Sequence, residues 1–158
     1  MKNQFDLHED DLSDGQVIEL LELHRLEMLK HSPPENVHAL DVDAMRSPDL
    51  TFWSARIPNK QKIIACGALK RLDSSHAELK SMKVSDSYIG KGLGRLMLNH
   101  LIEVAQKRGY QRLSLETGTM DVFIPARGLY ESIGFVECKP FADYFEDPHS
   151  VCMTLKLA

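Results

Sequence analysis

The chain has 158 residues, of which 43% are apolar and 27% charged, and its 19 basic and 23 acidic side chains give a net charge of −4. A chain of this length buries roughly 70% of its unfolded surface, so we expect one globular domain over residues 1–158 whose core needs no disulfide or metal. The acidic balance argues against nucleic-acid binding, and no apolar stretch reaches the roughly 20 residues of a membrane span.

The first predicted elements are helices. Residues 13–16 read S-D-G-Q, the form of a capping box, and apolar residues follow at helical spacing, so a helix is predicted to about His31. Pro33 and Pro34 end this helix, and Ser32 with Glu35 favours a second, short helix through Leu40. Residues 40–49 are predicted to form a loop.

Three strand candidates follow in close succession. Residues 51–57 are rich in β-formers, residues 58–60 are typical of a turn, and residues 62–70 are apolar on both faces, as in a central strand. Residues 76–84 alternate up to Leu79 and then change phase to Met82 and Val84. An odd step in a period of two predicts a β-bulge near residues 80–81, and such a bulge separates neighbouring strands.

The second half of the chain alternates strands and helices. A glycine-rich loop at residues 90–94 leads into a predicted helix that ends at Gly109. Residues 112–116 are predicted as a strand, residues 123–133 as a helix with Gly134 as its C-cap, and residues 135–139 and 151–157 as closing strands. A strand–helix–strand crossover makes the strands at 76–84 and 112–116 parallel, so we predict a mixed α/β sheet.

The glycine-rich segment at residues 88–95 reads Y-I-G-K-G-L-G-R. Between a strand and a helix, its backbone N–H groups and the helix dipole can bind phosphate oxygens, although a plain tight turn would use glycines equally well. It is neither a Walker A loop nor the dinucleotide fingerprint, because Arg95 and Leu96 follow Gly94. Residues 60–95 hold eight basic and three acidic side chains between acidic segments, which suits a compact anion or simply a solvated face of lysines.

Residues 126–135 read A-R-G-L-Y-E-S-I-G-F, and with the preceding bulged strand and glycine loop they resemble the GNAT superfamily of acyl-CoA-dependent N-acetyltransferases. The likeness is to a small bacterial-type single-domain member and is densest over residues 76–136. The motif A-x-x-L-Y-x-x-x-G-F matches in full. The cofactor loop Q/R-x-x-G-x-G/A begins here with Ile89, and Phe123 stands where the family often has Asn.

This resemblance implies the GNAT fold, a mixed and mostly antiparallel sheet of about six to seven strands with one parallel splayed pair and about four flanking helices. It implies acetyl-CoA as co-substrate and no metal. The bulged strand would hydrogen-bond the pantetheine arm, and the glycine loop would hold the pyrophosphate. The implied cofactor-binding residues are Met82, Lys83, Val84, Ile89, Gly90, Lys91, Gly92, Leu93, Gly94, Arg95, Thr117, Phe123, Ala126 and Arg127.

Amine acetylation needs a base and an acid, because only a neutral amine attacks a thioester and the departing thiolate must be protonated. Glu78 lies fourteen residues before Gly92, a spacing similar to that of the basic glutamate in the histone-acetylating branch. An ion pair with Lys80 is the alternative role for Glu78, and Glu116 is the competing carboxylate. Tyr130 occupies the position that family members use as the acid, or else it only packs on its helix.

The family usually builds its acceptor pocket from loops that correspond here to residues 33–49, 117–124 and 141–149. Their acidic side chains would attract a cationic amine, and their aromatic side chains could line an apolar slot; these residues are Asp41, Asp43, Asp121, Asp143, Glu146, Asp147, Phe123, Phe141, Tyr144 and Phe145. We therefore predict acetyl transfer to a primary amine of a small molecule or peptide by direct attack in a ternary complex. The alternatives are a non-catalytic acyl-CoA sensor and a longer acyl-CoA donor, and a homodimer stays open.

The remaining polar residues suggest no other chemistry. The three cysteines include no C-x-x-C pair, and Cys66 lies in an apolar run, so we expect no disulfide framework, zinc site or cysteine nucleophile. His24, His31 and His38 are spaced by seven, but Pro33 and Pro34 interrupt the helix that would align them on a metal. The N-terminus lacks the apolar region of a signal peptide, so a cytoplasmic enzyme is expected.

Overall fold

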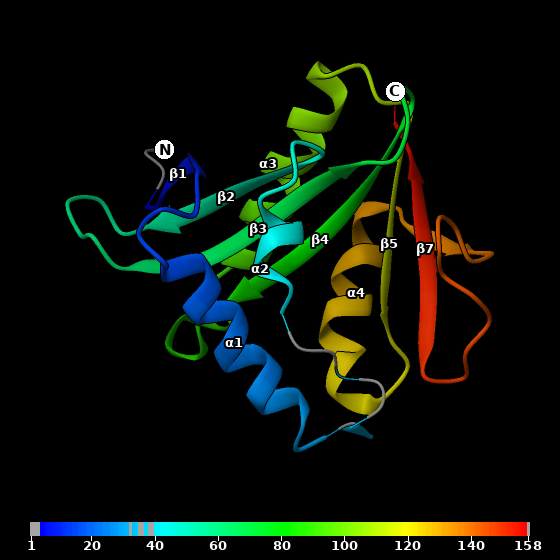
Figure 1. Ribbon diagram of the computed structural model, residues 1–158, viewed down its shortest axis with the longest axis horizontal. Coiled ribbons are helices and arrows are strands. Elements are labelled where there is room, and N and C mark those ends of the chain that lie inside the picture. The colour runs from blue at the N-terminus through cyan, green and yellow to red at the C-terminus, as the bar shows by residue number, and fades with distance from the viewer. Residues whose placement is uncertain (1–3, 32, 35–36, 38–39, 158) are drawn as a thin grey trace.

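Figure 1 shows the computed structural model, which describes residues 4–31, 33–34, 37 and 40–157. Seven strands form one sheet in the order β1-β2-β3-β4-β5-β7-β6. They are β1 (Asp6–Asp10), β2 (Leu50–Arg56), β3 (Ile63–Arg71), β4 (His76–Val84), β5 (Arg112–Gly118), β6 (Val136–Cys138) and β7 (Ser150–Lys156). Only β4 and β5 are parallel, which confirms the predicted mixed, mostly antiparallel sheet.

Within the described residues, four α-helices cover the two faces of the sheet. They are α1 (Gln16–Met28), α2 (Val42–Met45), α3 (Leu93–Lys107) and α4 (Ile124–Ile133), and two short 3-10 turns precede α3 and α4 at Asp86–Tyr88 and Asp121–Phe123. Buried side chains of α3 and α4 pack with those of β3, β4 and β5 in the larger core. A smaller core lies on the opposite face, where α1 and α2 cover β2 and β3 (Figure 1).

The side-chain alternation of β4 and β5 explains this layering. Ala77 and Leu79 of β4 and Leu113 and Leu115 of β5 all point into the larger core. The intervening Glu78 must then face the other side of the sheet, the side of α1. The polar positions of these central strands therefore share one face, and the apolar positions share the other.

The start of α1 differs from the predicted capping box. Gly15, with a φ of 76°, is the N-cap, and no side chain caps the helix. The Gln16 side chain instead donates to the Gln61 carbonyl at 2.9 Å and accepts from the Ile63 backbone N–H at 2.8 Å. Gln16 therefore ties the start of α1 to the start of β3, so the predicted capping box is wrong.

The N-terminal third also holds two elements that the sequence did not predict. β1 reads D-L-H-E-D and pairs only with β2 at the rim of the sheet, so it lacks the apolar alternation of an inner strand. In the predicted loop at residues 40–49, α2 forms a single turn whose N-cap, Asp41, accepts from the Ala44 N–H at 3.0 Å. Most of the predicted short helix from Ser32 to Leu40 lies outside the described residues.

Gly67 of β3 lies directly beneath α3, where there is little room for a side chain. A Cβ at this position would lie 2.8 Å from Leu101 Cδ1 and 3.1 Å from Met97 Cγ, both in the larger core. Gly67→Ala is therefore expected to lower the free energy of unfolding by about 1–3 kcal/mol through overpacking. Urea denaturation measures this loss.

Gly128→Ala is the matched control, because nothing lies within 4 Å of a Cβ at Gly128 and alanine is the better helix former. A Gly67→Ala midpoint at or above that of the wild-type protein would contradict the expected clash.

Candidate functional site

β4 and β5 form a wedge, because they pair only where both begin. Their register runs from His76 with Arg112 to Glu78 with Ser114, and beyond this point the two strands diverge (Figure 1). β5 continues fully paired with β7 as far as Gly118. From residue 80 onward, the side of β4 that faces β5 therefore has no strand partner within the described residues.

The predicted bulge in β4 is confirmed. The pairing of β3 with β4 shifts register between Cys66 and Ala68, and Ser81 adopts a φ of 56°, which is unusual for a residue with a side chain. The Cys66 thiol donates to the Ser81 carbonyl at 3.2 Å. Burial raises the pKa of Cys66 to about 12, so this thiol supports the bulge and is no nucleophile.

The glycine loop lies in solvent at the N-terminus of α3. Gly90 and Gly92 are exposed, with φ values of 84° and 80° that L-residues rarely adopt. Gly92 is the N-cap of the 15-residue helix, and no side chain caps its first N–H groups. A helix N-terminus of this length presents free donors and a partial positive charge, so the loop fits a phosphate group.

Packing holds the inner end of the same loop against the wedge. Leu93 is buried, and a Cβ on Gly94 would lie 3.6 Å from a Leu129 methyl of α4 and 3.8 Å from a Val84 methyl of β4. Met82 and Val84 are half-buried and pack against the larger core. The glycine loop, the end of β4 and α4 thus meet at the open end of the wedge.

The basic side chains in and near the glycine loop differ in their surroundings. Lys91 is exposed, the Arg95 guanidinium donates to the Ser132 hydroxyl of α4 at 3.0 Å, and Lys83 lies 3.5 Å from the Asp86 carboxylate. The excess of positive charge over residues 60–95 is not one patch, however. Lys62 lies just before β3 and Arg71 ends it, and the strand between them is about 26 Å long at the usual rise.

The remaining predicted cofactor residues lie at the end of β5, in the 3-10 turn after it and in α4. Thr117 is buried, and the Phe123 ring lies against Gly118. Arg127 Nη1 donates to the Gly118 carbonyl at 2.7 Å, a contact that the sequence did not predict. Ala126 is half-buried against the larger core. Arg127 therefore stabilises the turn that follows β5. No local sequence pattern indicates this hydrogen bond to the Gly118 carbonyl.

Glu78 is a buried carboxylate with one hydrogen-bond donor and one ion-pair partner. Its side chain faces the α1 side of the sheet and is 3% exposed. The Tyr144 hydroxyl donates to Glu78 Oε2 at 2.5 Å, and Lys80 Nζ lies 3.7 Å from the same oxygen. The ion pair with Lys80 that the sequence offered as an alternative is thus present, and the stronger contact with Tyr144 was not foreseen.

Glu116, the competing carboxylate, lies on the same face of the sheet. It follows Ser114 by two positions on β5, is exposed and stands opposite Cys152 of β7. Burial, the hydrogen bond to Glu78 and the nearby charge of Glu116 raise the pKa of Tyr144 well above its usual value. The Tyr144 side chain therefore lies near both candidate bases and stays protonated at neutral pH.

Tyr130 approaches from the other face. It is 9% exposed on α4, and its ring meets Phe135 edge-on with the ring centroids 5.7 Å apart. Burial raises the pKa of Tyr130 to about 12, so its hydroxyl keeps its proton throughout the physiological range. The structure thus brings a protonated phenol to the core side of the sheet and the candidate carboxylates to the opposite side.

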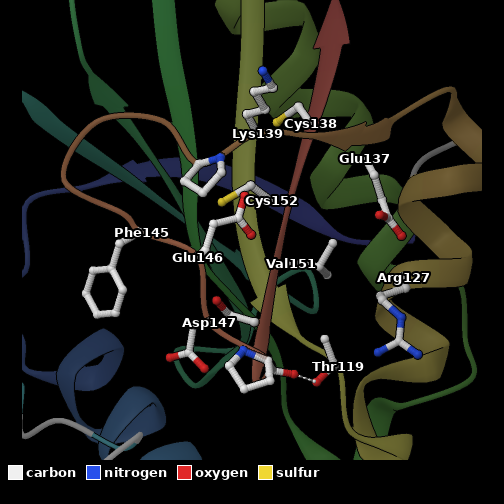
Figure 2. Close-up of a pocket in the computed structure, with 13 residues that line it drawn as sticks. Thr119, Arg127, Glu137, Cys138, Lys139, Phe145, Glu146, Asp147, Val151 and Cys152 are labelled. Atoms are coloured by element: carbon white, nitrogen blue, oxygen red, sulfur yellow. Dashed lines mark hydrogen bonds between the residues drawn. The ribbon is translucent and has the colours of Figure 1, made fainter.

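An open cleft of about 750 Å³ lies between α4, the β6–β7 edge and the loop that joins these strands (Figure 2). Figure 2 shows the Cys152 side chain on the side of Phe145 and the Val151 side chain on the side of Arg127. Two of the predicted acceptor loops line the cleft, through Thr119 in one and through residues 145–148 in the other. Glu78, Tyr130 and the glycine loop are not among its lining residues.

The described residues show no cluster of metal ligands and no disulfide. They contain no group of three or more His, Cys, Asp or Glu side chains that could hold a metal ion, and the three cysteines are free. None of the helices in this part of the chain combines the length and the apolar character needed to cross a bilayer.

Comparison with known proteins gives consistent matches. A family model described as the acetyltransferase (GNAT) family matches residues 17–135. The chain is 54% identical over 148 residues to the uncharacterised N-acetyltransferase YsnE of Bacillus subtilis, which covers 94% of this chain and 97% of that protein. It is 46% identical over 153 residues to the uncharacterised N-acetyltransferase YedL of Escherichia coli K12, covering 97% and 95%.

Solved structures share the fold. An acetyltransferase from Streptococcus agalactiae superposes with a TM-score of 0.76 at 20% identity, over 99% of this chain and 100% of that one. A GNAT family acetyltransferase from Elizabethkingia anophelis, solved with acetyl-CoA bound, gives a TM-score of 0.71 at 21% identity over 99% and 100%. At these identities, the likeness establishes the architecture.

Proposed function

Because the chain belongs to the acetyltransferase (GNAT) family, we propose that it transfers the acetyl group of acetyl-CoA to a primary amine of a small molecule or peptide. N-acetyl transfer is the activity for which two of its bacterial relatives, YsnE and YedL, are named. The amine attacks acetyl-CoA directly in a ternary complex. We also propose that residues 1–158 form a single domain and that the enzyme acts in the cytoplasm. The observation that carries this proposal is the wedge, in which pairing of β4 with β5 stops at Glu78.

The residues around the wedge fit acetyl-CoA. The exposed glycine loop and the uncapped N-terminus of α3 suit the pyrophosphate, and the unpaired side of β4 at residues 82–84 suits the amide-bearing pantetheine arm. Ile89 replaces a polar side chain of the family pattern, but backbone N–H groups make the proposed phosphate contacts. When bound, acetyl-CoA supplies an electrophilic thioester carbonyl. The acetyltransferase of Elizabethkingia anophelis that was solved with acetyl-CoA bound has the same fold.

We assign the base to Glu78, acting directly or through a water, with Glu116 as the alternative. An alkylammonium of pKa about 10.4 is neutral in fewer than about one molecule per thousand at pH 7, so a positioned carboxylate that takes its proton speeds attack. We assign the acid to Tyr130, whose raised pKa keeps the proton available for the departing sulfur. The carboxylates and the phenol act from opposite faces of the sheet, so the two proton transfers do not compete for the same space.

The acceptor is proposed to be cationic. Glu137, Glu146 and Asp147 outnumber Arg127 and Lys139 among the side chains that line the open cleft. A surplus of negative charge in a concave site raises the local concentration of an ammonium ion and lowers that of an anionic competitor. The cleft and the loops at residues 117–124 and 141–149 are thus the side from which the amine enters.

Thiol release from acetyl-CoA tests this function with a panel of n-butylamine, spermidine, lysine and an alanine-terminated peptide. We expect release that requires both the protein and an amine. Acetyl-CoA binding without release on any amine would favour the non-catalytic sensor. Tighter competition by succinyl-CoA than by acetyl-CoA would instead favour a longer acyl donor.

A further inference from the structure

Two aromatic residues of the loop between β6 and β7 fasten that loop onto β4. The Phe141 ring lies 5.7 Å from the His76 ring and 5.1 Å from the Tyr144 ring, measured between centroids. The Tyr144 hydroxyl reaches Glu78, and its backbone N–H donates to the Phe141 carbonyl at 3.0 Å. The loop therefore closes over the same polar face of β4 that carries the proposed base.

The turn between these two aromatics is strained. Ala142 adopts a φ of 50°, a left-handed conformation that costs an L-residue about 1–2 kcal/mol. A backbone in such a conformation persists only where surrounding contacts hold it. Phe141 on His76 and Tyr144 on Glu78 are two contacts that join the loop to β4, so loss of the second removes one restraint on the closed loop.

This closure covers the acid-base group that the mechanism needs. Glu78 is almost fully buried, and two groups, the hydrogen-bonding Tyr144 hydroxyl and the ion-paired Lys80 ammonium, both approach its oxygen Oε2. An amine that delivers its proton to this carboxylate must come within hydrogen-bond reach of it. The Tyr144 hydroxyl occupies that position on the side of the acceptor loops.

Building on the proposed function, we propose that Tyr144 is the gate of the acceptor site: its hydroxyl holds Glu78 in the free protein, and the acceptor amine displaces it. An ammonium group binds a carboxylate more strongly than a phenol does, so the exchange is favourable once the loop yields. Burial and the nearby carboxylates raise the pKa of Tyr144, so at working pH the hydroxyl leaves Glu78 by movement and not by ionisation.

Tyr144→Phe tests the gate kinetically, because it removes one oxygen and keeps the ring against Phe141. With the competing donor gone, the acceptor KM is expected to fall on the order of tenfold, the usual weight of a hydrogen bond to a charged group. The KM for acetyl-CoA should not change. Tyr110→Phe is the control, since it also removes one tyrosine hydroxyl, and Tyr110 lies just before β5, outside the site.

An unchanged acceptor KM would overturn the gate. A lower kcat with an unchanged acceptor KM would also overturn it, since Tyr144 would then be a residue that positions Glu78 for catalysis.

Nuclear magnetic resonance tests the displacement without turnover. The Cζ shift of a tyrosine reports the hydrogen bond of its hydroxyl, and the protein has only four tyrosines to label. The Tyr144 signal is identified by its loss in Tyr144→Phe. Addition of the best amine of the panel, without acetyl-CoA, should shift this signal and leave that of Tyr110 in place.

The two measurements separate the gate from the function on which it rests. Amine-dependent thiol release together with an unmoved Tyr144 signal would overturn the gate alone. Absence of thiol release with every amine would overturn the proposed function, and the gate with it. A displaced signal together with the lower acceptor KM would support both.

Discussion

Tyr130→Phe is expected to lower kcat by about 10²- to 10⁴-fold, the usual contribution of a positioned general acid. The substitution removes only the hydroxyl, so the ring keeps its edge-on contact with Phe135 and the fold should be unaffected. Single-turnover thiol release measures the chemical step, and calorimetry should find acetyl-CoA affinity within about a factor of two of wild type, because the acid acts mainly in the transition state.

Tyr110→Phe serves as the control for this substitution as well, because Tyr110 is buried to almost the same degree, at 8% exposed against 9% for Tyr130. The pH dependence gives a second check. With the Tyr130 pKa raised to about 12, the donor form prevails at all lower pH values, so the wild-type rate should not fall through phenol ionisation between about pH 6 and 10. An unchanged kcat in Tyr130→Phe would rule out the acid role.

Glu78→Gln is expected to reduce kcat/KM at neutral pH by about 10²- to 10⁴-fold, because glutamine cannot accept the ammonium proton. Its amide oxygen can still accept the Tyr144 hydrogen bond, so the loop contact need not be lost. The loss of kcat/KM in Glu78→Gln should become smaller as pH rises. Up to an amine pKa of about 10.4, each unit of increase in pH raises the amount of neutral amine about tenfold, and a neutral amine needs no base.

Glu116→Gln is the informative comparison, because Glu116 lies on the same face of the sheet and is exposed. Glu103→Gln, on the exposed side of α3, is the control for loss of a negative charge. A severe, pH-dependent loss in Glu116→Gln with a mild effect in Glu78→Gln would transfer the base role to Glu116.

The sequence could predict the features that depend on a local pattern of residues. The phase change from Leu79 to Met82 predicted the bulge, and the structure has the register shift and the left-handed Ser81 there. The glycines at 90 and 92 predicted a tight, exposed turn, and both adopt positive φ. In each case neighbouring residues alone determine the conformation, so a single sequence suffices.

The unpredicted features depend on residues that are distant in the chain or on elements too short for a period. The hydrogen bond between Glu78 and Tyr144 joins positions 66 residues apart, and nothing local marks either as the partner of the other. β1 is a polar strand at the rim, and α2 is one turn long, so neither leaves an apolar pattern. The basic residues of 60–95 are close in the sequence but do not form one patch, because the extended strand β3 separates the residues at its two ends.

The position of the unpaired side of β4 affects whether the protein self-associates. An open strand at the rim of a sheet recruits strands from other molecules and promotes aggregation. Here the open stretch lies between β3 and the diverging β5, inside the sheet, and not at either outer strand. A partner must therefore be a single extended chain that fits between two strands. The β-sheet of another molecule cannot pair there, while the backbone groups of β4 can still bind such a chain.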